Sequence, residues 1–338
     1  MRFSVPPKVP ERIRAQPLRV RIAARKPAGM KILARLGSQE SVLRLLLVLA
    51  ALVALILPLT GPAAAQDRVT FPSLDTDITG GRPTTIVAWL YRPQGSGPFP
   101  AVVALHDCSG LFERAGRMRG QLVASRADWA KRLSAAGYVV LLPDSFGPRS
   151  IAEVCTVKDR AAVGRARPRD AYGALTWLQA QPFVVPDRVA VLGWSHGGGT
   201  VMRIVEAESE ARPTALPHGG FRAAVAFYPG CPDPKATKSG RAWRSAVPLL
   251  ILIGEADDWT SPAACRNLAD AAAKRGEDVT LRIYPGAYHS FDSPNPGIRV
   301  RTGLAAAPGG TAHVGMDPAA RADAIERVPA FLRQHLGG

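Results

Sequence analysis

Residues 188–199 read RVAVLGWSHGGG, and this stretch decides the fold. It begins with a short apolar run that is typical of a strand buried on both faces of a parallel sheet. The pattern G-x-S-x-G follows at 193–197 and is typical of a sharp turn from a strand into a helix, which exposes the serine hydroxyl. The two glycines allow the close backbone approach that this turn needs. We therefore expect Ser195 to be a nucleophile; the alternative is a chance match in a chain with 32 glycines.

A serine at neutral pH needs a base, and the base needs a carboxylate that orients it. In chains with this kind of turn, the acid and then the histidine follow the serine in sequence. Asp257 comes after the apolar run PLLILIG, and His289 comes after the next strand-like run. Both residues then lie at the carboxyl edge of a parallel sheet, where ligands bind. We therefore expect Asp257 and His289 to complete a catalytic triad with Ser195.

Two other residues compete for these roles. Asp258 directly follows Asp257, and only one of the two carboxylates can face the histidine. His313 is the competing base, but a lone histidine is more often structural than catalytic. None of the six histidines has a metal-ligand spacing such as H-E-x-x-H, so we predict no metal and no cofactor.

Acyl transfer also needs hydrogen-bond donors that are aimed at the developing oxyanion. We expect one donor to be the backbone N–H of His196, because this residue follows the nucleophile. The other donor should come from the loop HDCSG, which follows the apolar run AVVAL. Within this loop we assign the role to the backbone N–H of Cys108.

Apolar runs alternate with helical patterns along the rest of the chain. This alternation predicts an α/β fold with a doubly wound, mostly parallel sheet flanked by helices. The predicted strands are 84–91, 101–106, 138–143, 188–194, 223–228, 248–254 and 279–284. The predicted helices are 129–136, 171–181 after an N-cap at Asp170, 262–275 after an N-cap at Ser261, and 317–336.

The segment 291–316 is the least regular part of the sequence. It contains Pro294, Pro296 and the adjacent Gly309 and Gly310, and is predicted to be a long loop between the last strand and the last helix. No linker divides the chain after Gln66, so residues 66–338 are predicted to form a single domain.

The positive charge of the chain is concentrated at its beginning. The whole chain has a net charge of +16, and residues 1–44 contain eleven Lys and Arg against two Glu, a net +9. The remaining +7 is spread over the rest of the sequence without a basic stripe. This distribution argues against a nucleic-acid partner.

Residues 1–65 have the organisation of a basic leader and signal peptide. Thirteen apolar residues at 45–57 follow Arg44, and the sequence AAA at 63–65 is acceptable to a signal peptidase. We expect cleavage after Ala65 and a secreted or periplasmic product. The alternative is a membrane anchor formed by residues 45–57, although thirteen helical residues are too short for a bilayer of about 30 Å. Translation could begin at Met1 or at Met30.

Four cysteines follow the signal segment: Cys108, Cys155, Cys231 and Cys265. An even number in an oxidising compartment predicts two disulfides, and four cysteines allow three pairings. Buried free thiols are the alternative.

The residues now described resemble the dienelactone hydrolase family from about residue 84 to residue 336. The resemblance is carried by HDCSGL at 106–111, DSFGPR at 144–149, RDAYGAL at 169–175, GWSHGG at 193–198, GEADDWT at 254–260 and GAYHSFD at 286–292. The last three motifs resemble the nucleophile, acid and histidine motifs of the family and favour Asp257 over Asp258. Founding members have a cysteine as nucleophile, so Ser195 makes the chain more similar to an exported, serine-bearing branch.

The resemblance implies an α/β-hydrolase fold and hydrolysis of a small ester or lactone. The usual strand order of these hydrolases also implies disulfides between Cys108 and Cys155 and between Cys231 and Cys265. Two other functions stay open. One is a serine peptidase, because related folds cleave peptides, and the other is an exported binding protein without catalytic activity.

Overall fold

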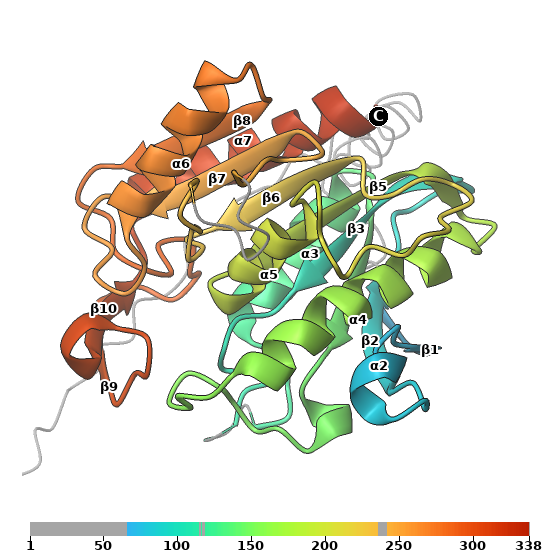
Figure 1. Cartoon of the computed structure of the whole chain (residues 1–338), viewed down its shortest axis with the longest axis horizontal. Coiled ribbons are helices and arrows are strands. Elements are labelled where there is room, and N and C mark those ends of the chain that lie inside the picture. Colours follow the sequence, from blue (N-terminus) through green and yellow to red (C-terminus); the bar gives the residue numbers. More distant parts are fainter. Residues whose placement is uncertain (1–65, 115, 117–118, 236–241, 338) are drawn as a thin grey trace, which may run out of the picture. The chain divides into compact units, whose positions relative to one another are not determined.

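An eight-stranded sheet organises the part of the chain that the structure describes (Figure 1). The structure is a computed structural model and describes residues 66–114, 116, 119–235 and 242–337. In the order β1-β2-β4-β3-β5-β6-β7-β8, the strands are β1 (Gln66–Pro72), β2 (Thr85–Tyr91), β4 (Val139–Asp144), β3 (Phe99–Leu105), β5 (Val184–Trp194), β6 (Ala223–Phe227), β7 (Leu249–Gly254) and β8 (Val279–Tyr284). Strands β3 to β8 are parallel, whereas β1 and β2 pair antiparallel at one edge.

Helices cover both faces of this sheet. They are α2 (Thr76–Thr79), α3 (Ala124–Ala135), α4 (Ala161–Gln179), α5 (His196–Ile204), α6 (Pro262–Lys274) and α7 (Pro318–Leu336). In Figure 1, α4 and α5 lie in front of the central strands, and α7 lies behind them. Every residue of β4, β6 and β7 is buried, which is the reason for their nearly continuous apolar sequences. The predicted fold class is therefore confirmed.

The structure differs from the sequence prediction in the helix before the nucleophile strand. Helix α4 begins at Ala161, ten residues before the predicted start, and it continues through Pro168. Asp170 was expected to cap the helix but lies inside it and is fully buried. Its carboxylate accepts hydrogen bonds from Ser73 and Arg149 instead. The predicted cap at Ser261 is confirmed, because its Oγ accepts the N–H of Ala264.

The predicted loop at 291–316 contains a β-hairpin. Strands β9 (Ile298–Thr302) and β10 (Thr311–Gly315) pair antiparallel and form a separate two-stranded sheet. The prolines and the adjacent glycines of the segment lie before the hairpin or in its turn. They therefore bound two short strands and do not indicate one irregular loop. Strand β1 was also not predicted; its sequence QDRVTFP contains few apolar residues because it is an edge strand with one buried residue.

Both cysteine pairs are disulfides. Cys108 is bonded to Cys155 and Cys231 to Cys265, which is the pairing that the family resemblance implies. Two disulfides fit an extracellular protein. No helix among the described residues has the length and apolar character needed to span a membrane. The predicted signal peptide and the possible anchor at 45–57 lie outside the described residues.

A buried ion cluster connects the antiparallel edge of the sheet to helix α4. The Arg149 guanidinium contacts the carboxylates of Asp75 and Asp170, both at 2.7 Å, and both carboxylates are fully buried. Asp75 also accepts hydrogen bonds from the backbone and side chain of Thr84. Arg149 is thus part of a buried ion cluster, whereas Arg169 forms its salt bridge with Asp77 at the surface.

We predict that Arg149→Met costs about 3–5 kcal/mol of unfolding free energy, because it leaves two buried carboxylates without their cation. Arg169→Met is the matched control. It removes an exposed pair from the same region and should cost less than about 1 kcal/mol. Urea unfolding of the two variants measures the difference, and equal losses would contradict the assignment.

Candidate active site

Ser195 occupies the sharp turn between β5 and α5. Its backbone has φ 52° and ψ −114°, a conformation that side-chain-bearing residues rarely adopt. The turn is possible because the neighbouring residues lack side chains. A Cβ at Gly193 would meet the backbone of Gly197, and a Cβ at Gly197 would meet the carbonyl oxygens of Leu105 and His106. The predicted strand–turn–helix context of the serine is therefore present.

The structure brings Ser195, His289 and Asp257 together. The Nε2 atom of His289 lies 2.9 Å from the Ser195 hydroxyl, and its Nδ1 atom lies 2.8 Å from the Asp257 carboxylate. All three side chains are buried, with exposed fractions of 7%, 1% and 5%. His289 can thus donate from Nδ1 to the carboxylate and accept the hydroxyl proton at Nε2.

The loop after β7 holds the Asp257 carboxylate by three hydrogen bonds. One oxygen accepts the backbone N–H groups of Trp259 and Thr260, at 2.9 and 2.8 Å. The other accepts the Thr260 hydroxyl at 2.9 Å as well as the histidine. Thr260 was missed by the sequence analysis, although a hydroxyl three residues after the aspartate is a readable signal for a local capping bond.

Two aromatic rings enclose the imidazole of His289. The ring centroids of Tyr228 and Trp259 lie 4.4 and 4.7 Å from that of the histidine. Tyr228 follows β6 with φ 36°, and Ser290 follows the histidine with φ 61°. Both positive values show that tertiary contacts, rather than local preference, determine the backbone here.

The competing acid and base contact each other. His313 on β10 places Nδ1 2.7 Å from the Asp258 carboxylate and donates its backbone N–H to the same carboxylate at 2.9 Å. Hydrogen bonding by His313 contributes to lowering the pKa of Asp258, although burial acts in the opposite direction. The pair therefore connects the β9–β10 hairpin to the loop after β7, which carries Asp257. His289 is next to Val314 of β10 through an isolated β-bridge.

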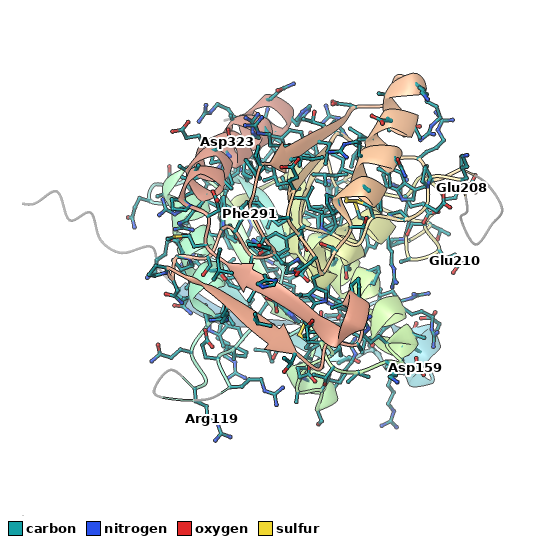
Figure 2. All side chains as sticks on the ribbon, turned by 90° about the vertical axis from the view of Figure 1, so that its left-hand side faces the viewer. Arg119, Asp159, Glu208, Glu210, Phe291 and Asp323 are labelled. Atoms are coloured by element: carbon teal, nitrogen blue, oxygen red, sulfur yellow. A yellow bond between two sulfur atoms is a disulfide. The ribbon has the colours of Figure 1, made fainter. Side chains whose placement is uncertain are left out.

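The β9–β10 hairpin lies on the side of the molecule that Figure 2 shows. Its inward residues Ala312 and Val314 belong to a second, smaller apolar cluster that includes Trp259 and the Cys108–Cys155 disulfide. The segment predicted to be a long loop therefore packs, through its hairpin, beside Trp259 and the Cys108–Cys155 disulfide.

A cavity of about 400 Å³ opens at Ser195. Apolar and polar residues both line it: Cys108, His196, Met202, Trp243, Trp259, Thr260 and, among the charged residues, Arg160, Arg203 and Glu206. The volume is that of a small-molecule site. No group of three or more His, Cys, Asp or Glu side chains within the described residues could hold a metal ion.

The loop after β3 lies beside the nucleophile, as the sequence analysis expected. Neither the N–H of Cys108 nor that of His196 donates to a backbone carbonyl within the part of the chain described. The carbonyl of Cys108 accepts the N–H of Val154 at 2.8 Å, and the disulfide to Cys155 fixes the side chain. The loop is thus attached at both its backbone and its side chain.

Two histidines, the buried His106 and the partly buried His196, lie in this region. The ring of His106 is held between the Asp107 carbonyl, at 2.8 Å from Nδ1, and the Ser145 N–H, at 3.3 Å from Nε2. Burial, followed by the charge of Arg167, lowers the pKa of His106 well below its usual value and that of His196 to about 2. Both rings are therefore neutral at physiological pH.

The structure gives Asp292 a buried role that the sequence analysis did not predict. Its carboxylate is fully buried and accepts hydrogen bonds from the indoles of Trp129 and Trp194, at 2.7 and 3.0 Å, and from the Tyr228 hydroxyl at 2.7 Å. Trp194 precedes the nucleophile, and Tyr228 packs on His289. Asp292 lies three residues after the histidine, but nothing in the local sequence shows which donors it receives.

The comparisons with known proteins agree with this architecture. The model of the Dienelactone hydrolase family matches residues 86–336. A protein of Azospirillum brasilense that is named as a carboxymethylenebutenolidase is 25% identical over 271 residues, which are 78% of this chain and 99% of the relative.

Two solved structures resemble the fold. A dienelactone hydrolase of Klebsiella pneumoniae has a TM-score of 0.55 at 17% identity, and the match covers 80% of this chain and 99% of that one. Esterase 2 of Thermogutta terrifontis, phosphorylated by paraoxon, has a TM-score of 0.53 at 18% identity, with 81% and 94% covered. At these identities the likeness shows the fold alone.

The loop after β3 also contains an ion pair, and this pair makes the stability of the protein depend on pH. Asp107 contacts the buried Arg126 at 2.6 Å and accepts both the backbone and side chain of Ser109. Burial raises the pKa of Asp107, but Arg126 and Ser109 outweigh it and lower the pKa to about 2. A carboxyl whose folded pKa lies below its unfolded pKa of about 3.9 stabilises the protein above that value and loses the effect as pH falls toward 2.

We predict that Asp107→Asn destabilises the protein by about 2–3 kcal/mol at pH 5 and by about half as much at pH 3. Urea unfolding at the two pH values measures the change. The exposed Asp67 provides the control, because Asp67→Asn should cost less than about 1 kcal/mol at either pH. A penalty for Asp107→Asn that does not change with pH would refute the linkage.

Proposed function

Because the chain belongs to the dienelactone hydrolase family, we propose that it hydrolyses small carboxylic esters or lactones through an acyl-serine intermediate on Ser195. The observation that carries the proposal is the contact chain from the Ser195 hydroxyl through His289 to Asp257, with 2.9 and 2.8 Å steps, at a cavity of about 400 Å³. The name of the Azospirillum brasilense relative, a carboxymethylenebutenolidase, supports a lactone or ester rather than a peptide.

The first half of the reaction forms the acyl-enzyme. The Ser195 hydroxyl oxygen attacks the carbonyl carbon while Nε2 of His289 takes the hydroxyl proton. Asp257 stabilises the resulting imidazolium through its hydrogen bond with Nδ1. The backbone N–H groups of Cys108 and His196 are the donors proposed for the oxyanion. Collapse of the tetrahedral intermediate expels the alcohol, which receives the proton from His289.

The second half releases the acid. A water molecule gives a proton to Nε2 of His289 and attacks the acyl carbon, and the same N–H groups stabilise the second oxyanion. Collapse of this intermediate breaks the bond between the acyl carbon and the Ser195 oxygen, which takes the proton back from His289, and the carboxylic acid leaves. The aromatic rings of Tyr228 and Trp259 keep the imidazole in one orientation throughout.

We also propose that residues 1–65 direct export and are removed after Ala65, which leaves residues 66–338 as a single hydrolase domain. The two disulfides support an oxidising destination. N-terminal sequencing of the protein from the culture medium or periplasm tests the cleavage site.

We predict that Ser195→Ala lowers kcat for p-nitrophenyl acetate by at least about 10⁴-fold, because no nucleophile is left at the turn. Purified protein beginning at Gln66 is assayed by release of p-nitrophenol. A fluorophosphonate probe should label the wild type and not the variant. Equal turnover in both proteins would reject Ser195 as nucleophile, and labelling without ester or lactone turnover would move the function to a peptidase.

Neighbouring aspartates give a matched test of the acid. We predict that Asp257→Asn lowers kcat by about 10³–10⁴-fold, since an amide cannot stabilise the imidazolium or enforce its tautomer. Asp258→Asn should change kcat less than about threefold, because Asp258 contacts His313 rather than His289. The reverse order of effects would assign the acid to Asp258.

A further inference from the structure

Arg167 on α4 is a buried cation at the junction of the two segments that carry the proposed oxyanion donors. Its side chain is fully inaccessible to solvent. One terminal nitrogen, Nη1, lies 2.6 Å from Nδ1 of His196, and the other, Nη2, donates to the carbonyl oxygen of His106 at 2.5 Å. The guanidinium also lies over the ring of Phe146, with its central carbon 5.2 Å from the ring centroid.

The two segments already touch through their backbones at this point. A Cβ on Gly197 would collide with the carbonyl oxygens of Leu105 and His106, so the first turn of α5 packs directly on the oxyanion loop. Arg167 bridges the same two segments with hydrogen bonds. It reaches the residue after the nucleophile on one side and the residue two before Cys108 on the other.

Burial of the Arg167 guanidinium costs desolvation free energy, and few contacts offset that cost. No carboxylate forms an ion pair with Arg167 among the described residues, and its Nε atom has no hydrogen-bond partner. Burial lowers the pKa of Arg167 to about 10, with the acids Asp170, Asp107 and Asp144 acting against the shift, so the group stays charged at neutral pH. A buried charge with no carboxylate in direct contact contributes little stability to a fold, so stability alone does not explain this arginine.

The contact with Arg167 also fixes the protonation of His196. A guanidinium has only donors, so Nδ1 of His196 must accept and the ring proton must be on Nε2. The positive charge of Arg167 and burial both keep this ring neutral. The ring that follows the nucleophile is therefore held in one tautomer and one place.

We infer that Arg167 is a positioning residue of the oxyanion hole. By binding the His196 ring and the His106 carbonyl, Arg167 holds the backbone N–H groups of His196 and Cys108 in their positions relative to each other. The inference rests on the proposed acyl-transfer function.

The test compares Arg167→Met and Arg167→Lys with Arg169→Met, a control on the same helix whose partner is the surface residue Asp77. With p-nitrophenyl acetate, Arg167→Met should lower kcat about 10–100-fold and change KM less than about threefold, because misplaced donors affect the transition state more than binding. Arg167→Lys should recover part of the loss. Arg169→Met should keep kcat within about twofold.

A second readout does not depend on activity. ¹⁵N NMR of the His196 ring should show Nδ1 as an unprotonated acceptor in the wild type and a mixture of tautomers in Arg167→Met. A folded Arg167→Met protein with wild-type kcat would overturn the inference, and so would an equal loss in Arg169→Met. If Arg167→Met does not fold, a folded Arg167→Lys protein with wild-type kcat and an unchanged His196 spectrum would also overturn it. Loss of the proposed function itself is recognised separately, because Ser195→Ala would then match the wild type.

Discussion

The arrangement of the site depends on one buried carboxylate. Asp292 accepts hydrogen bonds from three ring donors, those of Trp129, Trp194 and Tyr228, at a depth where water does not reach. A buried carboxylate needs such partners, because burial of an unpaired charge is prohibitive. Each donor comes from a different element: helix α3, the end of β5 and the loop after β6. Through its hydrogen bond with Trp194, the Asp292 carboxylate fixes the segment after β8, which carries His289, against the end of β5, which is followed by Ser195.

A second constraint acts at the opposite side of the serine. The turn at Ser195 is strained, and glycine backbones lie against the loop that follows β3. The disulfide at Cys108, the Asp107–Arg126 pair and the Arg167 contacts all act on this loop or its neighbours. Donors for an oxyanion are useful only when they are held in place before the reaction. The polar and covalent contacts around Cys108 are consistent with that requirement.

The sequence was sufficient for the fold class, the turn at Ser195 and the order of acid and histidine. These features depend on local sequence patterns, namely apolar runs and glycines beside a serine. Such patterns predict the same local structure whatever the rest of the chain contacts. The early start of α4 could not be predicted, because Pro168 suggests a break and the partners of Asp170 lie far away in sequence. Asp292 and Arg167 were missed for the same reason. Their roles depend on donors and acceptors that only the folded chain brings together.

The two cross-links have a consequence for where the protein can work. One closes the chain between the oxyanion loop and the segment before α4, and the other joins the loop after β6 to α6. In a reducing cell interior neither bond persists. A newly made chain would then hold the loop of Cys108 only by its non-covalent contacts, the hydrogen bond to Val154 and the Asp107–Arg126 pair. Under the export proposed above, the hydrolase would reach its final covalent form only after it has left the reducing cell interior.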